Sequence, residues 1–234
     1  MSAEPGDAIH AWLDLELSRS QHEQLAVVER LLREDRDAPT SARAAEGAAK
    51  VHVADSLAAL ELDVVSQAGA IADLGAGAGF PGLALAVALP GSEVRLVESR
   101  RRACEFLRRA CAAAAVKNAR VVCERAEEWT AGMVGNDAVV ARAVASQPVV
   151  LEYAAPLLRV GGALVDWRGR RAPEEERAAD AAAAELGMRR AEVRRVRPFE
   201  DALERHLHVF EKIAATPSRF PRRPGVARKR PLGA

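Results

Sequence analysis

Three glycines and two carboxylates occur close together in the first half of the chain, at spacings that suit nucleotide binding. They are Asp73, Gly75, Gly77, Gly79 and Glu98. The first acid lies near the end of one apolar run, and the second directly follows another. Glycine permits backbone angles closed to other residues, and its missing Cβ lets a ligand lie against the main chain. An acid at the end of the second strand can accept hydrogen bonds from both hydroxyls of a ribose.

The glycine pattern fits two kinds of ligand. Gly77-x-Gly79-x-x-Gly82 formally matches the dinucleotide motif G-x-G-x-x-G. In that motif, however, the strand before the first glycine is uncharged and the helix receives a pyrophosphate. Here Asp73 comes two residues before the first glycine. A carboxylate suits a cation better than a phosphate, and S-adenosylmethionine carries an ammonium, a sulfonium and a ribose. The loop therefore favours S-adenosylmethionine over a dinucleotide.

The elements around this loop alternate between strand and helix from Ala70 onward, which predicts an α/β fold with a mostly parallel sheet. We expect seven strands and a Rossmann-like class I S-adenosylmethionine-dependent methyltransferase fold with an N-terminal helical extension. The first expected strand begins near Ile71 and ends in the acid Asp73. The other expected strands cover 93–97, 119–123, 137–141, 161–167, 188–196 and 206–213. The expected helices of this domain cover 83–89, 100–115, 148–158 and 173–186. The corresponding domains are 1–66, the helical extension, 67–215, the methyltransferase domain, and 216–234, a basic tail.

The extension is expected to hold two helices within 8–36 and a further helix over 48–62. Ser20-x-x-Glu23 has the spacing of a helix N-terminal capping box. His52 and Asp55 would share one face of the later helix. A histidine there is either a catalytic group or a packed or solvent-facing residue.

Further site candidates follow the third and fourth strands. After the third strand, the backbone of Ala126 and the carboxylate of Glu127 would lie against an adenine. Acids that stabilise a helix N-terminus explain Glu127 and Glu128 equally well. Arg142 follows the fourth strand, whose carboxyl end borders the ligand crevice of an open α/β sheet. Its alternative role is that of a surface arginine at the start of a helix.

The segment around Arg142, Val140-Ala-Arg-Ala-Val-Ala-Ser146, limits the chemistry. Methylation of an exocyclic amine typically uses an Asn or Asp followed by Pro-Pro and an aromatic residue, and methylation of a pyrimidine carbon needs a cysteine. Neither is present there. Guanine N7 remains as an acceptor because its lone pair is free and no proton has to be removed. Arg142 should then contact O6, a phosphate or the carboxylate of the donor rather than N7.

Composition and charge indicate the cellular compartment and the kind of binding partner. No apolar run can span a bilayer, and the N-terminus is acidic, which argues against a secretion signal. The three cysteines lack metal-binding spacing. We expect a cytoplasmic monomer without a metal. The first 70 residues hold 6 basic and 13 acidic residues, whereas 216–234 hold 6 basic residues and no acid. Such a basic arm either binds phosphates or is a solvated end.

Several motifs together resemble the bacterial small-subunit rRNA guanine-N7 methyltransferase family, once called glucose-inhibited division protein B. They are Asp73-Leu-Gly-Ala-Gly-Ala-Gly-Phe-Pro-Gly82, Val97-Glu-Ser99, Arg125-Ala-Glu-Glu128, Ala141-Arg-Ala-Val-Ala-Ser146, Gly161-Gly162 and Thr216-Pro-x-Arg-Phe-Pro-Arg-Arg-Pro-Gly225. The resemblance covers roughly residues 50 to 232. The N-terminal region departs from it, because Glu34-Asp35 and Pro39-Thr40 replace the usual Trp-Asn and Asn-Leu-Thr, and Val51 replaces the arginine that usually precedes His52. After the fifth strand, Arg168 replaces a lysine.

This resemblance implies a donor site at Gly75, Phe80, Ala126, Glu127 and Arg142, with Arg142 also serving catalysis. It implies a guanine of 16S rRNA, in free RNA or in the small ribosomal subunit, as the acceptor. The altered N-terminal region leaves three alternatives: a donor-binding protein without activity, a methyltransferase for another RNA, and one for a small molecule.

Overall fold

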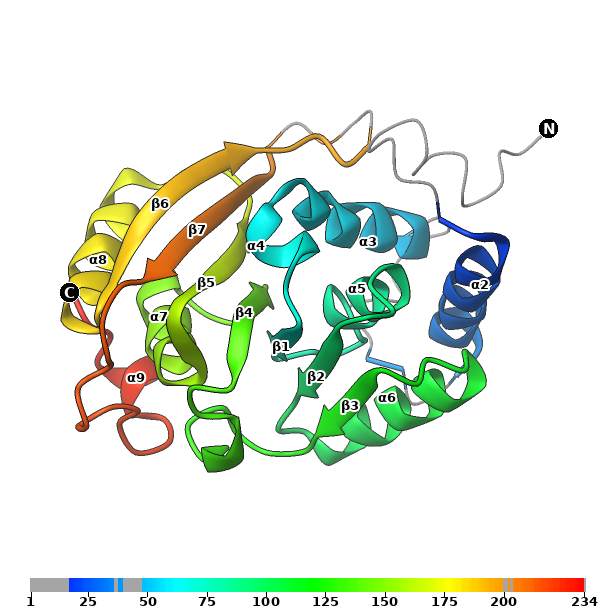
Figure 1. The fold of residues 1–234 in the computed structure, drawn as a ribbon, viewed down its shortest axis with the longest axis horizontal. Helices are drawn as coiled ribbons and strands as arrows, with labels where there is room; N and C mark the ends of the chain where they lie inside the picture. Colours follow the sequence, from blue (N-terminus) through cyan, green and yellow to red (C-terminus); the bar gives the residue numbers. More distant parts are fainter. Residues whose placement is uncertain (1–16, 36–37, 40–47, 200–201, 203, 234) are drawn as a thin grey trace.

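The structure of the protein is a computed structural model that describes residues 17–35, 38–39, 48–199, 202 and 204–233. Its centre is a seven-stranded sheet in the order β3-β2-β1-β4-β5-β7-β6 (Figure 1). The strands are β1 (Ala70–Leu74), β2 (Glu93–Val97), β3 (Ala119–Val122), β4 (Asn136–Arg142), β5 (Leu158–Arg168), β6 (Met188–Arg195) and β7 (His206–Lys212). Strands β1 to β5 are parallel, and β7 runs antiparallel to both β5 and β6. The predicted α/β fold with a mostly parallel seven-stranded sheet is therefore confirmed.

The central strands β1 and β4 are buried over most of their length because both faces of the sheet are covered. Ile71 and Val94 belong to the core on one face, while Ala72 and Val97 belong to the core on the other. The helices of the first face are α2 (Arg19–Glu34), α3 (Ala48–Leu57), α4 (Asp63–Ser66), α5 (Gly82–Ala88) and α6 (Arg101–Ala113). Those of the second face are α7 (Gln147–Ala154), α8 (Pro173–Glu185) and α9 (Val226–Lys229). Short 3-10 helices cover Ala58–Glu61, Thr130–Gly132 and Ala155–Leu157.

Two local predictions differ from the structure. The capping box of α2 is formed by Ser18 and Gln21 rather than by Ser20 and Glu23. The helix starts two residues earlier than the Ser20 pattern suggests, so the Ser20 hydroxyl lies within the first turn and bonds that of Ser18. The first of the two helices expected within 8–36 lies largely outside the described residues.

Strand β5 begins at Leu158 rather than at Gly161. The two glycines, expected at the start of the strand, lie within it and opposite a register shift in β4. Gly161 has φ +84°, and a Cβ on Gly162 would lie 2.6 Å from the carbonyl oxygen of Asp137. Glycine therefore allows β4 and β5 to approach closely at an irregular point of the ladder.

The strand order reverses between β1 and β4, which places a crevice beyond their carboxyl ends. In the register of this pair, Leu74 of β1 lies opposite Ala141 of β4. The glycine loop after β1 and Arg142 at the end of β4 thus reach the same edge of the sheet. This edge is where the candidate site lies.

Within the described ranges, no helix is both long and apolar enough to cross a bilayer. The same part of the chain contains no group of three or more His, Cys, Asp or Glu side chains that could hold a metal ion. All three cysteines are free thiols.

Candidate functional site

The glycine loop takes backbone angles that favour glycine. Gly75, Gly77 and Gly79 have φ values of +67°, +52° and +98°. The amides of Gly75 and Ala76 donate to the carbonyl oxygen of Val97 at 2.8 and 3.1 Å, which holds the loop against the end of β2. A Cβ on Gly75 would lie 3.0 Å from the Val144 side chain. Glycine at this position therefore lets the β1 loop pass beside the loop that follows β4.

Asp73 lies beneath the loop rather than in a cavity wall. Its side chain is fully buried, and its Oδ2 accepts a hydrogen bond of 2.8 Å from the amide of Gly82, at the start of α5. A Cβ on Gly82 would lie 2.5 Å from that oxygen. Oδ1 is buried and has no hydrogen-bond partner in the described structure. Asp73 thus bonds the turn of its own loop with one oxygen, and its role toward a cationic ligand stays a prediction.

Burial raises the pKa of Asp73 to about 7, against the lowering effect of the Gly82 amide. At pH values between the ordinary aspartate pKa near 4 and about 7, the Asp73 carboxyl keeps a proton in the native state that it has lost in the unfolded state. The free energy of unfolding should therefore fall as the pH rises through this window. We expect Asp73→Asn to flatten this dependence in chemical denaturation between pH 5 and 7.5.

Asp137→Asn is the control for this measurement, because Asp137 should be ionised in both the native and the unfolded state between pH 5 and 7.5, so that its replacement should not change the slope there. Hydrogen bonds from Arg159 and from the amides of Gly69 and Ala70 outweigh desolvation and lower the pKa of Asp137. Its ionised form therefore stabilises the native state, and this contribution is lost as the pH falls through its folded pKa. An identical pH slope for the wild-type protein and Asp73→Asn would contradict the assignment to Asp73.

Glu98 holds the loop and borders the cavity beside it. Its Oε2 accepts from the Gly77 amide at 3.1 Å and its Oε1 from the Arg100 amide at 2.8 Å. Only 5% of the residue is exposed. Oε1 also accepts from Arg100 Nε at 3.4 Å, whereas Oε2 retains a lone pair, so the carboxylate can still accept from a ribose hydroxyl.

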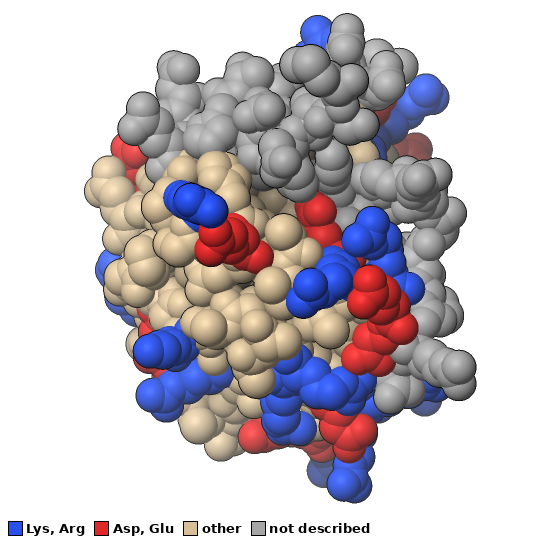
Figure 2. Space-filling view, turned by 90° about the vertical axis from the view of Figure 1, so that its right-hand side faces the viewer, with Lys and Arg blue, Asp and Glu red and all other residues tan. Residues whose placement is uncertain are grey.

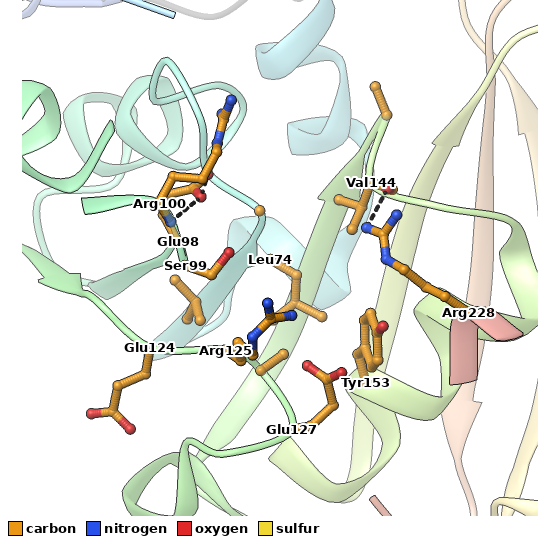
Figure 3. Close-up of a pocket in the computed structure, with 14 residues that line it drawn as sticks. Leu74, Glu98, Ser99, Arg100, Glu124, Arg125, Glu127, Val144, Tyr153 and Arg228 are labelled. Carbon is orange, nitrogen blue, oxygen red and sulfur yellow. Dashed lines mark hydrogen bonds and ion pairs between the residues drawn. The ribbon is translucent and has the colours of Figure 1, made fainter. Parts of the chain in front are cut away.

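A cavity of about 380 Å³, here named the glycine-loop cavity, opens beyond β1, β2 and β4 (Figure 3). Four of the predicted site residues line it, namely Gly75, Glu98, Ala126 and Glu127. Asp73, Gly77, Gly79, Phe80 and Arg142 do not. Figure 3 shows Glu98, Ser99 and Arg100 on one side and Glu127, Tyr153 and Arg228 on the other.

Tyr153 and Arg228 were missed by sequence reasoning. Tyr153 is the only tyrosine of the chain, but it lies in an apolar helix that reads as core. Arg228 lies in the basic tail, whose composition indicated a phosphate-binding arm and not a cavity wall. No local signal distinguishes either residue.

Arg142 lines a second cavity of about 420 Å³, here named the Arg142 cavity. Its Nη1 donates to Asp55 Oδ2 at 2.9 Å, and its guanidinium carbon lies 5.9 Å from the centre of the Phe80 ring. The His52 ring stacks on the same Phe80 ring, with 5.8 Å between the two ring centroids. The helix face predicted to carry His52 and Asp55 therefore meets Arg142, with Trp167 donating from β5 to the Asp55 carbonyl at 2.9 Å.

The two cavities meet at Ala143, which lines both of them. This residue has φ +57°, an uncommon angle for a side chain with a Cβ. Burial and the nearby Arg142 lower the pKa of His52, so its imidazole is neutral near pH 7. Two binding cavities that share one wall can hold two reactants with their reacting atoms next to each other.

Comparisons with known proteins identify the family of this chain. The family described as rRNA small subunit methyltransferase G matches residues 34–207. A protein of that name from Rubrobacter xylanophilus is 41% identical over 77% of this chain and 72% of its own length. Another from Chloroflexus aggregans is 38% identical over 95% of this chain and 94% of its own.

Among solved structures, a mitomycin 7-O-methyltransferase is similar over 79% of this chain and 60% of its own, with a TM-score of 0.61 and 16% identity. That similarity concerns the fold alone. One conclusion follows from that similarity, the strand order, the glycine loop and the sequence identity to relatives aligned over most of their length. The chain has the class I methyltransferase fold and belongs to the rRNA small subunit methyltransferase G family.

Proposed function

We propose that this protein transfers a methyl group from S-adenosylmethionine to N7 of a guanine in 16S rRNA. The observation that carries the proposal is the pair of cavities that meet at Ala143, one beside the glycine loop and one around Arg142. Its relatives bear the name ribosomal RNA small subunit methyltransferase G, which supports small-subunit rRNA as the substrate.

The residues of the glycine-loop cavity fit the proposed donor. Glu98 lies at the end of β2, where its carboxylate can bind a ribose, and Ala126 and Glu127 lie where an adenine can be recognised. Gly75 leaves the main chain open to the cavity. Asp73 Oδ1, buried below the loop without a hydrogen-bond partner in the described structure, is a free acceptor next to the loop. S-adenosylmethionine, when bound, supplies a methyl group on a positively charged sulfur.

The Arg142 cavity fits a base that needs no proton removed. N7 of guanine attacks with its own lone pair, so the bond to sulfur breaks as the bond to nitrogen forms, and the products are N7-methylguanine and S-adenosylhomocysteine. No general base is required. Arg142 and its partner Asp55 are then positioning groups, with the guanidinium available to guanine O6 or to an RNA phosphate. Catalysis consists chiefly of alignment.

The test is methyl transfer to small ribosomal subunits from a strain that lacks this protein. Labelled S-adenosylmethionine should place label on one guanine, located by reduction and aniline cleavage, which cut RNA at N7-methylguanine. Transfer should fall steeply with salt, because RNA binding displaces counterions. Donor binding without label in RNA would indicate a binding protein, and salt-insensitive transfer to a small molecule would indicate a different substrate class.

A further inference from the structure

The basic tail, expected as an arm or a solvated end, packs on the methyltransferase domain. Phe220 and Ala227 are 7% and 2% exposed and belong to the same core cluster as Tyr153. Arg222 pairs with Glu152, whose side chain is buried in α7, and its Nε lies 2.8 Å from Glu152 Oε1. The segment therefore crosses the second face of the sheet and ends beside α7 and α8 (Figure 1).

The same segment forms part of the glycine-loop cavity. The amide of Gly225 donates to Glu127 Oε1 at 3.2 Å, and Arg228 Nη2 donates to the carbonyl oxygen of Val144 at 3.0 Å. Arg228, Tyr153 and Glu127 lie together on one side of the cavity (Figure 3). The tail thus touches the carboxylate expected to recognise an adenine and also the loop directly after Ala143.

The outer side of the tail carries cations that lack an acidic partner within the described structure, namely Arg223, Lys229 and Arg230, all of them exposed. Some exposed arginines elsewhere have an acidic partner: Arg19 pairs with Glu23 on α2, and Arg101 pairs with Glu105 on α6. Figure 2, seen from the side where α2 and α6 lie, shows basic and acidic side chains mixed. The tail instead offers a group of exposed cations to RNA phosphates.

Resting on the function proposed above, we propose that the tail is a wall of the donor site that also binds RNA phosphates. Arg228 holds the purine end of the donor site in place through Val144, and Gly225 orients Glu127. RNA bound to Arg223, Lys229 and Arg230 stabilises this wall. RNA and donor then raise each other's affinity, since a coupling free energy between two sites is reciprocal.

The first experiment measures S-adenosylmethionine binding by calorimetry to the full-length protein, Arg228→Ala and Arg219→Ala. Arg228→Ala should raise the dissociation constant about tenfold, because it frees the loop after β4. Arg219→Ala is the matched control, since Arg219 is an exposed arginine of the same tail that pairs with Glu185 and does not line the cavity. Equal affinities for all three proteins would overturn the proposal.

The second experiment measures binding of S-adenosylhomocysteine, which cannot react, with and without small-subunit rRNA. RNA should tighten binding several-fold in the wild-type protein and not in the triple variant Arg223→Ala, Lys229→Ala, Arg230→Ala. The triple variant should also lower the salt slope of RNA binding by about three. Wild-type affinity unchanged by RNA would overturn the coupling while leaving the function intact. No donor binding at all by the wild-type protein would overturn both.

Discussion

Arg142→Ala should lower kcat for methyl transfer to small-subunit RNA by about 100-fold while leaving the dissociation constant of S-adenosylmethionine within about threefold. Arg142 lines its own cavity and not the glycine-loop cavity, so its loss should affect alignment of the acceptor more than donor binding. Single-turnover transfer and donor calorimetry separate the two quantities.

Two further measurements make this prediction specific. Arg142→Lys keeps the charge but loses the planar fork that bonds Asp55, so its kcat should be intermediate. Arg159→Ala removes an arginine at the start of β5 that pairs with Asp137 of β4 and lines neither cavity, so turnover should remain unchanged. Thermal unfolding of each variant shows whether it remains folded. Full activity of a folded Arg142→Ala protein would remove Arg142 from the mechanism.

Arg222→Ala should lower the free energy of unfolding by about 3–5 kcal/mol, which is roughly 10 °C in the melting temperature for a chain of this size. Glu152 is 1% exposed, and Arg222 is its ion-pair partner. Removing the arginine leaves a buried carboxylate without its counter-charge. Scanning calorimetry measures the change.

Arg219→Ala is the matched control for stability. It removes an exposed ion pair with Glu185, so the free energy of unfolding should fall by no more than about 1 kcal/mol, with a correspondingly small drop in melting temperature. Combining Arg222→Ala with Glu152→Leu should recover part of the loss, because the uncompensated charge is then gone. Equal effects for Arg219→Ala and Arg222→Ala would show that burial of Glu152 does not set the stability of the tail.

Much of the fold could be predicted from the sequence because the relevant signals are local. Apolar runs such as Ala138–Ala141 form strands that are buried on both faces, and their alternation with helices leads to a parallel sheet. The positive φ values of Gly75, Gly77 and Gly79 follow from residue type. The same motifs carried the family assignment, which the whole-length relatives confirm.

Only the tertiary structure decided which side chains line each of the two cavities. Arg142 meets Asp55 across 87 positions of sequence, Glu127 meets Gly225 across 98, and Arg228 meets Val144 across 84. Sequence spacing indicates which residues reach the carboxyl edge of the sheet. Which cavity a side chain enters depends on how distant segments of the chain pack against it. This packing places Arg228 of the basic tail in the lining of the glycine-loop cavity and Asp73 under the loop.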